Sequence, residues 1–294
     1  MSGAVWTRER RWLLAPAAAL LLLVVAFPIA RLLALSLCRT ELSHGIVLRF
    51  AGFEQHARLW QDGRWWLALR NTLVFGVCSV TAELTLGTAF ALLLDRSFRG
   101  RRWARAIVMV PWVLPSAVMA LAWAWIFNDS FGVLNDLLSR MGLVRGPVAW
   151  LGSPVTAMAA MIVADVWKTT PFVALVVLAG LQSIPSSVIE AARVEGATSA
   201  RILWHVVLPL VRPACLVALA FRGLQAMGAF DVPYVMTGGG PGGSTETISL
   251  YAYRSFYRYL DFGYGAAIAV QGALVTALAL IPITLLAGRR RGAS

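Results

Sequence analysis

Six long apolar runs divide the sequence, and they constrain the fold more than any other feature. A helix needs about 20 mostly apolar residues to cross the hydrocarbon core of a bilayer. Lipid offers the backbone no hydrogen bonds, so runs of this kind fold as helices. The sequence therefore predicts an all-α, polytopic membrane protein with six transmembrane helices. The runs cover residues 12–38, 67–94, 106–127, 155–181, 206–230 and 264–287.

The composition agrees with a membrane protein. Hydrophobic residues make up 59% of the 294 residues and charged residues 14%, whereas a typical soluble domain has about 45–50% and about 25%. No internal repeat or low-complexity linker interrupts the sequence. We therefore expect residues 1–294 to form one transmembrane domain surrounded by membrane lipid, without a second, soluble domain.

The arginines indicate which side of the membrane each loop occupies. The net charge is +12, and every Lys or Arg except Lys168 is arginine. Loops rich in these residues lie in the cytoplasm, so six spans place both termini there. The arginines form no continuous stripe, so nucleic-acid binding is not expected. The clusters are Arg8, Arg10 and Arg11 before the first run, Arg96, Arg99, Arg101, Arg102 and Arg105 between the second and third, and Arg289, Arg290 and Arg291 after the last.

The first run also has to be distinguished from a signal peptide. Arginines followed by an apolar stretch are typical of such peptides, but this run is longer than their apolar region and further spans follow it. We interpret residues 12–38 as an uncleaved first span.

Residue types that usually carry catalysis or bind metals are scattered. The three cysteines and three histidines form no CxxC motif and no ligand cluster. No Ser-His-Asp set or carboxylate pair suggests bond-making chemistry. The glycine-rich segment 238–245 lacks the Gly-Lys-Ser/Thr ending of a phosphate-binding loop, and we interpret it as a flexible turn. We therefore expect no catalytic residue, no metal site and no cofactor in this chain.

The segment 185–209, between the fourth and fifth runs, predicts a helix followed by a sharp turn. Ser187 with Glu190 three residues later has the pattern of a capping box, which starts a helix. Gly196 suits the end of that helix, where the backbone often adopts a positive φ.

A second short helix is expected after this turn. Thr198 or Ser199 can cap its first residue. Pro209 marks the entry to the fifth run, so the two short helices form an elbow at the cytoplasmic membrane surface.

The same segment resembles the EAA loop of binding-protein-dependent ABC importer permeases. The pattern in that family is Glu-Ala-Ala, three residues, Gly-Ala and, further on, Leu-Pro. Glu195 stands where the family usually has Asp before the Gly, which is a mild departure. The residues that match in order and spacing are Glu190, Ala191, Ala192, Gly196, Ala197, Leu208 and Pro209.

The resemblance implies a set of partners and a location. In the family the elbow is the coupling helix, and it docks on an ATPase subunit. The implied assembly has a second permease subunit that completes a heterodimer, two ATPase subunits that bind ATP and Mg, and an extracytoplasmic solute-binding protein. The chain itself is then not an enzyme, and it lies in the cytoplasmic (inner) membrane of a bacterium or archaeon. The residues implied to contact the ATPase are Glu190, Ala191, Ala192, Glu195, Gly196 and Ala197.

Other stretches narrow the resemblance to carbohydrate-uptake permeases, and they extend it over nearly the whole chain. They resemble the first permease subunit of trehalose, maltose and glycerol-3-phosphate transporters, so the expected solute is a sugar such as a disaccharide. The same architecture importing glycerol-3-phosphate or another small solute stays open. An ion-coupled carrier or a membrane enzyme is the alternative from a different class. The stretches are 50–55, 71–73, 165–172, 178–182 and 230–245.

Charge is costly inside an apolar run and usually marks a pair or a path. The charged residues in these runs that we consider for such a role are Glu83, Asp165, Lys168 and Arg222. Asp165 and Lys168 are three residues apart, so they share a helix face and can pair. Pro171 removes a helical hydrogen bond and can open the backbone there, as in transporters with broken helices.

The resemblance implies that the fourth and fifth spans supply the solute contacts. The implied substrate-path residues are Lys168, Thr169, Phe172, Arg222 and Gln225. The alternative is that the charged ones brace neighbouring helices. For Glu83 we expect a packing or subunit-contact role.

The expected topology is open to a direct test. Single cysteines introduced in segment 238–245 are expected to react with a membrane-impermeant thiol reagent added outside the cell, because that loop lies outside. Cysteines introduced at 96–105 are expected to stay unlabelled until the membrane is opened. The reverse labelling pattern would exclude the six-span arrangement.

Overall fold

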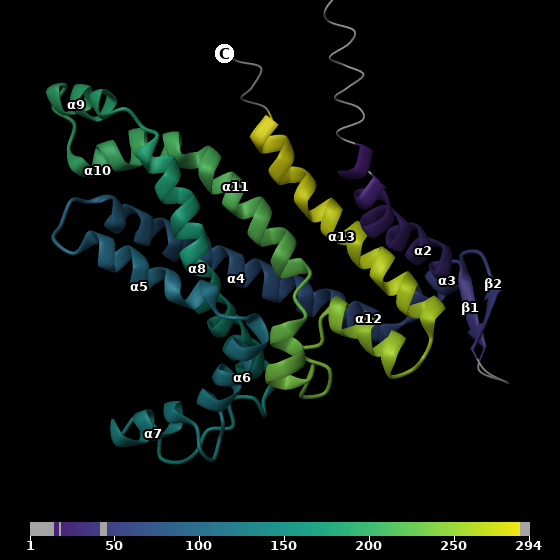
Figure 1. Cartoon of the computed structure of the whole chain (residues 1–294). Coiled ribbons are helices and arrows are strands. Elements are labelled where there is room, and N and C mark those ends of the chain that lie inside the picture. Colours follow the sequence, from purple (N-terminus) through teal and green to yellow (C-terminus); the bar gives the residue numbers. More distant parts are fainter. Residues whose placement is uncertain (1–14, 18, 42–45, 289–294) are drawn as a thin grey trace, which may run out of the picture. The chain divides into compact units, whose positions relative to one another are not determined.

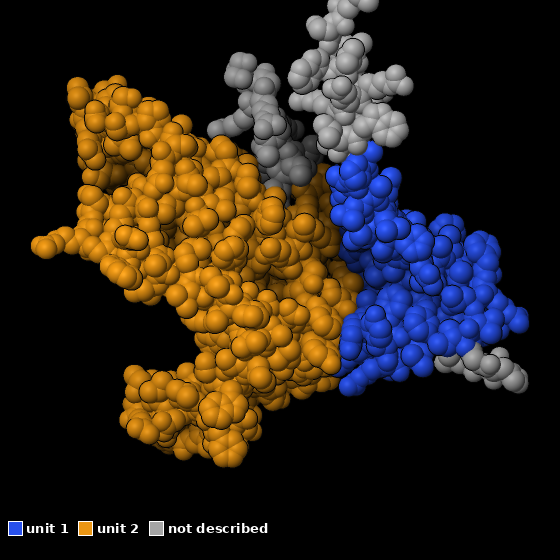
Figure 2. All heavy atoms as spheres, in the orientation of Figure 1, with its two compact units in different colours: residues 1–65, 251–273 blue, residues 66–250, 274–294 orange. Residues whose placement is uncertain are grey.

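The computed structural model describes residues 15–41 except Ala18, and residues 46–288, with side chains up to Pro282. The terminal arginine clusters, His44 and the predicted start of the first span at residue 12 lie outside these residues. Within them the chain is mainly helical (Figure 1), which confirms the polytopic helical fold. Contacts divide it into two compact units, Met1–Trp65 with Tyr251–Ala273 and Trp66–Leu250 with Leu274–Ser294 (Figure 2).

Five helices of the described residues are long and apolar enough to cross a membrane. The first includes a π-helical turn, Leu22–Ala26, and α2, Phe27–Ser36. The second, third and fifth are α4 (Gly63–Asp95), α8 (Pro154–Gln182) and α13 (Phe262–Gly288). The fourth ends in α11, Leu208–Met227. The five crossing segments are Ala15–Ser36, Gly63–Asp95, Pro154–Gln182, Ser199–Met227 and Phe262–Pro282.

The predicted third span, 106–127, is not one straight helix. It consists of α5 (Arg101–Val113) and α6 (Ser116–Ile126), which meet at an angle of 92°. Leu114 and Pro115 between them are extended, with ψ of 137° and 134°. A residue before proline is pushed out of the helical region, so the sequence pair itself causes the break. Counting this bent pair as one span gives the expected total of six.

The first unit contains a β-hairpin that the all-α prediction missed. Strands β1 (Cys38–Glu41) and β2 (Val47–Phe50) pair antiparallel, with Cys38 opposite Phe50. Gly263, near the start of α13, approaches β1 so closely that a Cβ atom there would collide with the Cys38 carbonyl. Its N–H donates to Thr40 Oγ1 at 3.0 Å. The hairpin and α13 are therefore joined through a position that only glycine fits.

Asp62 joins three elements of the first unit. It follows α3 (Glu54–Gln61) and accepts hydrogen bonds from the hydroxyls of Tyr251, on α12 (Ile248–Tyr257), and Tyr264, on α13, the latter at 2.5 Å. The Arg64 backbone N–H donates to it at 2.8 Å. Burial raises the pKa of the Asp62 carboxyl, but these hydrogen bonds outweigh it and the pKa lies below its ordinary value. Burial and the Asp62 contact raise the pKa of Tyr251.

The second unit is built on close contacts among α4, α8 and α11. Gly180 lies so near α11 that a Cβ atom there would come within 2.5 Å of the Ala214 Cβ, and one on Gly87 would come within 2.7 Å of Val173. Small residues at such crossings let helix backbones approach each other. Buried apolar side chains fill the space on either side, among them Ala91, Val173, Val177, Val211 and Ala218.

The glycine-rich segment 238–245 is more constrained than the flexible turn we expected. It follows a π-helical turn, Pro233–Thr237. Asn71 on α4 donates through Nδ2 to the carbonyls of Gly243 (2.8 Å) and Glu246 (3.1 Å), and the Thr237 and Thr245 hydroxyls are 2.7 Å apart. These bonds tie the segment to α4. A further helix, α7 (Val133–Arg140), lies in the 128–153 connection.

The Asp62 contacts make the stability of the first unit sensitive to acid. A carboxyl whose pKa is lower when folded stabilises the folded state above its unfolded pKa, near 3.8, and this contribution is lost as the pH falls through the folded value. We expect Asp62→Asn to lower the free energy of unfolding at pH 7 by about 1.5–3 kcal/mol. The difference from wild type should shrink as the pH falls below 4.

Denaturation at pH 7 and pH 3 in detergent measures this difference. Glu41→Gln is the matched control, because among the described residues its carboxylate pairs with Arg49 at 3.2 Å at the protein surface, and surface pairs contribute about 0–1 kcal/mol. An Asp62→Asn chain as stable as wild type at pH 7 would contradict the assignment.

Candidate functional site: a polar pocket and an exposed elbow

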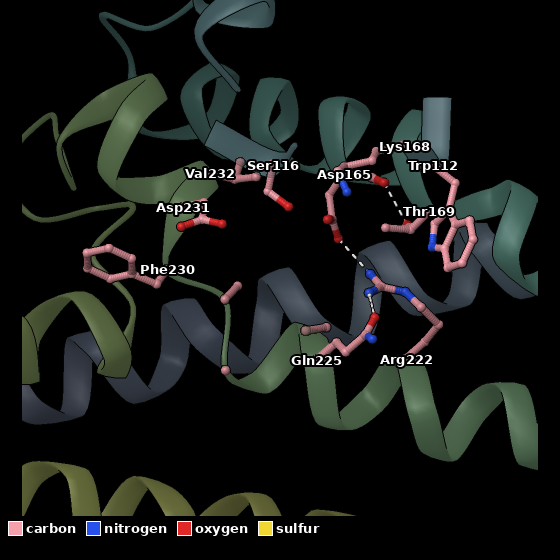
Figure 3. Close-up of a pocket in the computed structure, with 13 residues that line it drawn as sticks. Trp112, Ser116, Asp165, Lys168, Thr169, Arg222, Gln225, Phe230, Asp231 and Val232 are labelled. Atoms are coloured by element: carbon pink, nitrogen blue, oxygen red, sulfur yellow. Dashed lines mark hydrogen bonds and ion pairs between the residues drawn. The ribbon is translucent and has the colours of Figure 1, made fainter. Parts of the chain in front are cut away.

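A cavity of about 320 Å³ lies in the second unit, beside the break between α5 and α6. Side chains from α8 and α11 face each other across it, with the segment after α11 at one end (Figure 3). Polar and aromatic groups meet here at the depth of the membrane spans. The side chains with polar or aromatic groups that line it are Trp112, Ser116, Asp165, Lys168, Thr169, Arg222, Gln225, Phe230 and Asp231.

Arg222 is the centre of an ion cluster on one wall of this pocket. Its Nε and Nη2 atoms donate hydrogen bonds to the two carboxylate oxygens of Glu83 at 2.5 and 2.8 Å. Nη2 also donates to Asp165 Oδ2 at 2.9 Å, and Nη1 donates to Gln225 Oε1 at 2.8 Å. The Arg222 side chain is 4% exposed and that of Glu83 0%. The cluster ties α4, α8 and α11 together, so Arg222 braces helices and lines the pocket at once.

Lys168 does not form the pair with Asp165 that its spacing allows. Asp165 turns to Arg222 instead, because that guanidinium reaches it from α11 with a direct hydrogen bond. In the part of the chain that the structure describes, no carboxylate lies within 4 Å of the Lys168 ammonium group. Lys168 lines the pocket, where Asp231 supplies a further carboxylate. A cation is thus available for a bound solute.

The remaining predicted path residues on α8 are placed differently from one another. Thr169 lines the pocket, but its hydroxyl donates to the Asp165 carbonyl at 2.6 Å. Phe172 lies beyond the pocket lining and packs on Trp112 and Phe221, each ring centre 5.8 Å away. Pro171 does not break α8, which continues to Gln182. The interruption that we expected there occurs between α5 and α6.

The elbow forms between α8 and α11 as a hairpin of two short helices (Figure 1). They are α9 (Ser186–Val194) and α10 (Ser199–Ile202). Gly196 has a φ of +81°, and Thr198 Oγ1 accepts a hydrogen bond from the Arg201 N–H at 3.4 Å. The predicted turn and second cap are therefore confirmed.

Two details of the elbow prediction are wrong. Helix α9 follows Pro185 and already includes Ser187, so Ser187 and Glu190 form no capping box. The extended backbone of Pro185, directly before the first turn, marks the start of α9 instead. The second helix also does not end before Pro209, because residues Ser199–Met227 form one continuous helix through a π-helical turn at Leu203–Val207.

The predicted coupling residues lie together on the surface of the elbow. Glu190, Ala191, Glu195 and Gly196 are exposed, and Ala192 and Ala197 are half-buried. Val194 beside them is 90% exposed. Apart from Gly196 itself and its chain neighbours, no atom of the described residues lies within 4 Å of the position that a Cβ on Gly196 would occupy. An open surface of small, apolar and acidic groups can receive another protein at close range.

Sequence reasoning missed the partners that reach the pocket from other segments. Trp112 and Ser116 come from the two sides of the α5–α6 break, and Asp231 follows α11. We identified Glu83 as a charged residue within a span. Its pairing with Arg222 could not be predicted from local sequence, because 139 residues separate the two. Only the fold brings these groups together.

The spanning helices, the polar pocket among them and the exposed elbow together are features of a polytopic membrane permease. Residues 83–291 match the family described as binding-protein-dependent transport system inner membrane component. The chain belongs to this family.

Several curated proteins are similar over most of their length. The sulfoquinovosyl glycerol transport system permease protein SmoG of Agrobacterium fabrum is 42% identical over 88% of this chain and 83% of its own. The trehalose/maltose transport system permease protein MalF of Thermococcus litoralis is 41% identical over 82% and 81%. The trehalose transport system permease protein SugA of Mycobacterium tuberculosis is 37% identical over 89% and 84%.

Solved structures agree on the fold. A chain of a bacterial ABC transporter involved in the import of the acidic polysaccharide alginate superposes with a TM-score of 0.82 at 23% identity, covering 97% of this chain and 99% of its own. A second alginate transporter structure, in complex with an alginate pentasaccharide-bound periplasmic protein, gives 0.80 at 24% identity, with 96% of each chain covered.

Mutations in the ion cluster and at Lys168 are expected to change the free energy of unfolding by very different amounts. Glu83→Ala leaves the buried Arg222 with one carboxylate, and we expect it to lower the free energy of unfolding by about 3–5 kcal/mol. Lys168→Ala removes a charge with no ion-pair partner within 4 Å in the described residues, so we expect a change within about 0.5 kcal/mol. Chemical denaturation of both purified variants in the same detergent measures the difference. Equal losses of stability would contradict the two roles.

Proposed function

We propose that the chain is a permease subunit of an ATP-driven ABC importer and that its solute is a sugar. The observation that carries this proposal is the pocket between α8 and α11, the two helices that run into the elbow. Each of these helices thus connects a stretch that contacts the solute with an end that leads to the energy source. Relatives named for trehalose, maltose and sulfoquinovosyl glycerol support a sugar.

The pocket chemistry favours a solute with many hydroxyls. Lys168 and Ser116 can donate hydrogen bonds, Gln225 and Asp231 can accept them, and Trp112 offers an aromatic face for a sugar ring. A phosphate-bearing solute such as glycerol-3-phosphate fits less well. Arg222, the group suited to bidentate phosphate binding, is already held by two carboxylates.

A second permease subunit completes the path in this proposal. Lipid cannot solvate polar groups at membrane depth, yet Lys168 and Asp231 line an open cavity there. A protein surface has to cover it, and a second permease in a heterodimer supplies one with its own polar groups. An extracytoplasmic solute-binding protein delivers the sugar from the opposite side to the elbow.

Energy enters through the elbow. Two ATPase subunits bind ATP and Mg, and each receives the exposed surface of one permease elbow, here Glu190 to Ala197. Closure of the ATPases moves the elbows, and the spans alternate between inward-facing and outward-facing states. The arginine-rich loop 96–105 and both termini lie on the cytoplasmic side with the elbow.

Two elbow variants test the coupling. Gly196→Val forces a positive φ on a branched residue, at a cost of about 1–3 kcal/mol in local strain, and misdirects α10. Glu190→Lys reverses the charge offered to the ATPase. Each chain should still insert in the membrane, but it should lose the ATPase in pull-downs or keep ATP hydrolysis while sugar uptake falls.

Gly142→Val is the matched control for these variants. Gly142 also has a positive φ, +69°, with open space around it, but it lies after α7, away from the elbow. It should leave uptake and ATPase retention unchanged. Normal uptake and retention in both elbow variants would show that the elbow does not couple.

A pocket variant tests the solute path. We expect Lys168→Ala to reduce uptake of labelled trehalose or maltose roughly 10-fold to 100-fold, the loss of one charged hydrogen bond. Assembly and basal ATP hydrolysis should persist. Failure of assembly would instead assign Lys168 a structural role, and unchanged uptake of every accepted sugar would remove it from the path.

A further inference from the structure

A second cavity in the same unit has no role in the proposed transport of sugar. It has a volume of about 280 Å³ and lies between the end of α4, the first turns of α5 and the last turns of α8. These helix ends carry the arginine cluster of loop 96–105.

The cavity is polar at one end and apolar along its length. Arg105 and Gln182 line it near the helix ends, whereas Val108, Ala174 and Leu175 line it further into the spans. From residue 174 to 182 along α8 the wall extends about 12 Å at the helical rise. A compact polar solute does not match such a wall. An amphiphile does, with its head at the helix ends and its chain along α8.

Arg105 has a donor to spare at the polar end. Its Nη2 atom donates a hydrogen bond to the Leu94 carbonyl at 3.3 Å, and Arg101 Nε donates to the same carbonyl at 2.7 Å. The Arg105 Nε is buried and has no hydrogen-bond partner within the described residues. Buried donors without a partner are rare. Arg105 lines the cavity, so a small rotation of its side chain lets an acceptor held in the cavity satisfy this donor.

The surroundings favour an acceptor with negative charge at a membrane surface. Arg99 and Arg102 nearby are exposed and form no ion pair in the described part of the chain. Trp103, next to Arg102, is 73% exposed, and tryptophan is enriched at the membrane interface. Basic pockets between spans on the cytoplasmic side bind lipid head groups.

We propose that this cavity binds one phospholipid with an anionic head group. Its phosphate accepts a hydrogen bond from Arg105 Nε, and one acyl chain lies along α8 against Leu175. Only three residues separate Gln182 from the first residue of α9, so the bound lipid supports the end of α8 from which the elbow starts.

Lipid titration of the purified full-length chain tests the proposal. The delipidated protein in neutral detergent is titrated with dioleoyl phosphatidylglycerol or dioleoyl phosphatidylcholine, and bound lipid is counted by native mass spectrometry. The phosphate is ionised in both lipids, but phosphatidylcholine also carries a cation, which Arg105 at the polar end repels. We therefore expect one site with about tenfold preference for the anionic lipid. Arg105→Gln should abolish the preference, and Arg99→Gln, an exposed neighbour outside the cavity lining, should retain it.

A second variant tests the acyl chain separately and does not depend on the arginine. Ala179→Phe fills the cavity wall and should weaken binding of both lipids at this site, whereas Val163→Phe, on an exposed part of α8, should not. The proposal is overturned if Arg105→Gln keeps the preference, if Ala179→Phe binds as wild type, or if inorganic phosphate competes fully. Loss of the lipid on assembly with the other subunits also overturns it, because the cavity is then a protein interface.

Discussion

A guanidinium group stays charged at any pH that a cell reaches, so an arginine buried between membrane spans obliges the chain to supply carboxylates around it. Arg222 meets Glu83 and Asp165, and each of the three residues comes from a different helix. A shift of one residue along any helix moves its side chain by about 1.5 Å along the axis and breaks contacts of 2.5–2.9 Å. The cluster therefore sets the register of α4, α8 and α11, and with it the wall of the pocket.

Close backbone approach makes that register possible. Gly87 and Gly180 admit the Val173 side chain and the Ala214 methyl group where larger residues would hold the helices apart. The carboxylates can then reach Arg222 directly. The ion pairs and the close packing at glycine both fix the positions of the same three helices. The positions of the side chains that line the pocket are therefore fixed by both.

Much of the architecture was predictable because its causes are local. The apolar runs gave the spans, since a helix across lipid needs only length and hydrophobicity, and Gly196 and Thr198 indicated the turn and cap of the elbow. The third span is bent, which we did not predict although its cause is also local, because Pro115 forces Leu114 out of the helix. Pro185 likewise displaced the expected capping box.

The candidate site was predictable in its residues and not in its pairing. Lys168, Thr169, Arg222 and Gln225 do line one pocket. Helical spacing assigned Asp165 to Lys168, but the choice of Arg222 depends on which helices lie beside α8, and no spacing within one segment contains that information. Asp231 was missed for the same reason, since its contact with the pocket is made across the fold. The hairpin β1–β2 pairs residues that are close in the sequence, such as Cys38 and Phe50, and it was missed because the prediction considered helices alone.

The continuous helix from Ser199 to Met227 connects the elbow directly to the ion cluster, so a movement of one is transmitted to the other. About 35 Å of helix separates Ser199 from Arg222 at the usual rise per residue. Rotated as a stiff lever through about 5° about its elbow end, it would carry the guanidinium by about 3 Å, roughly the full length of a hydrogen bond. A small rotation of the elbow at the membrane surface is thus enough to break or form the ion cluster around Arg222 in the membrane-spanning part of the chain. The π-helical turn at Leu203–Val207 and Pro213 inside α11 are the places along this helix where bending can absorb such a rotation before it reaches Arg222.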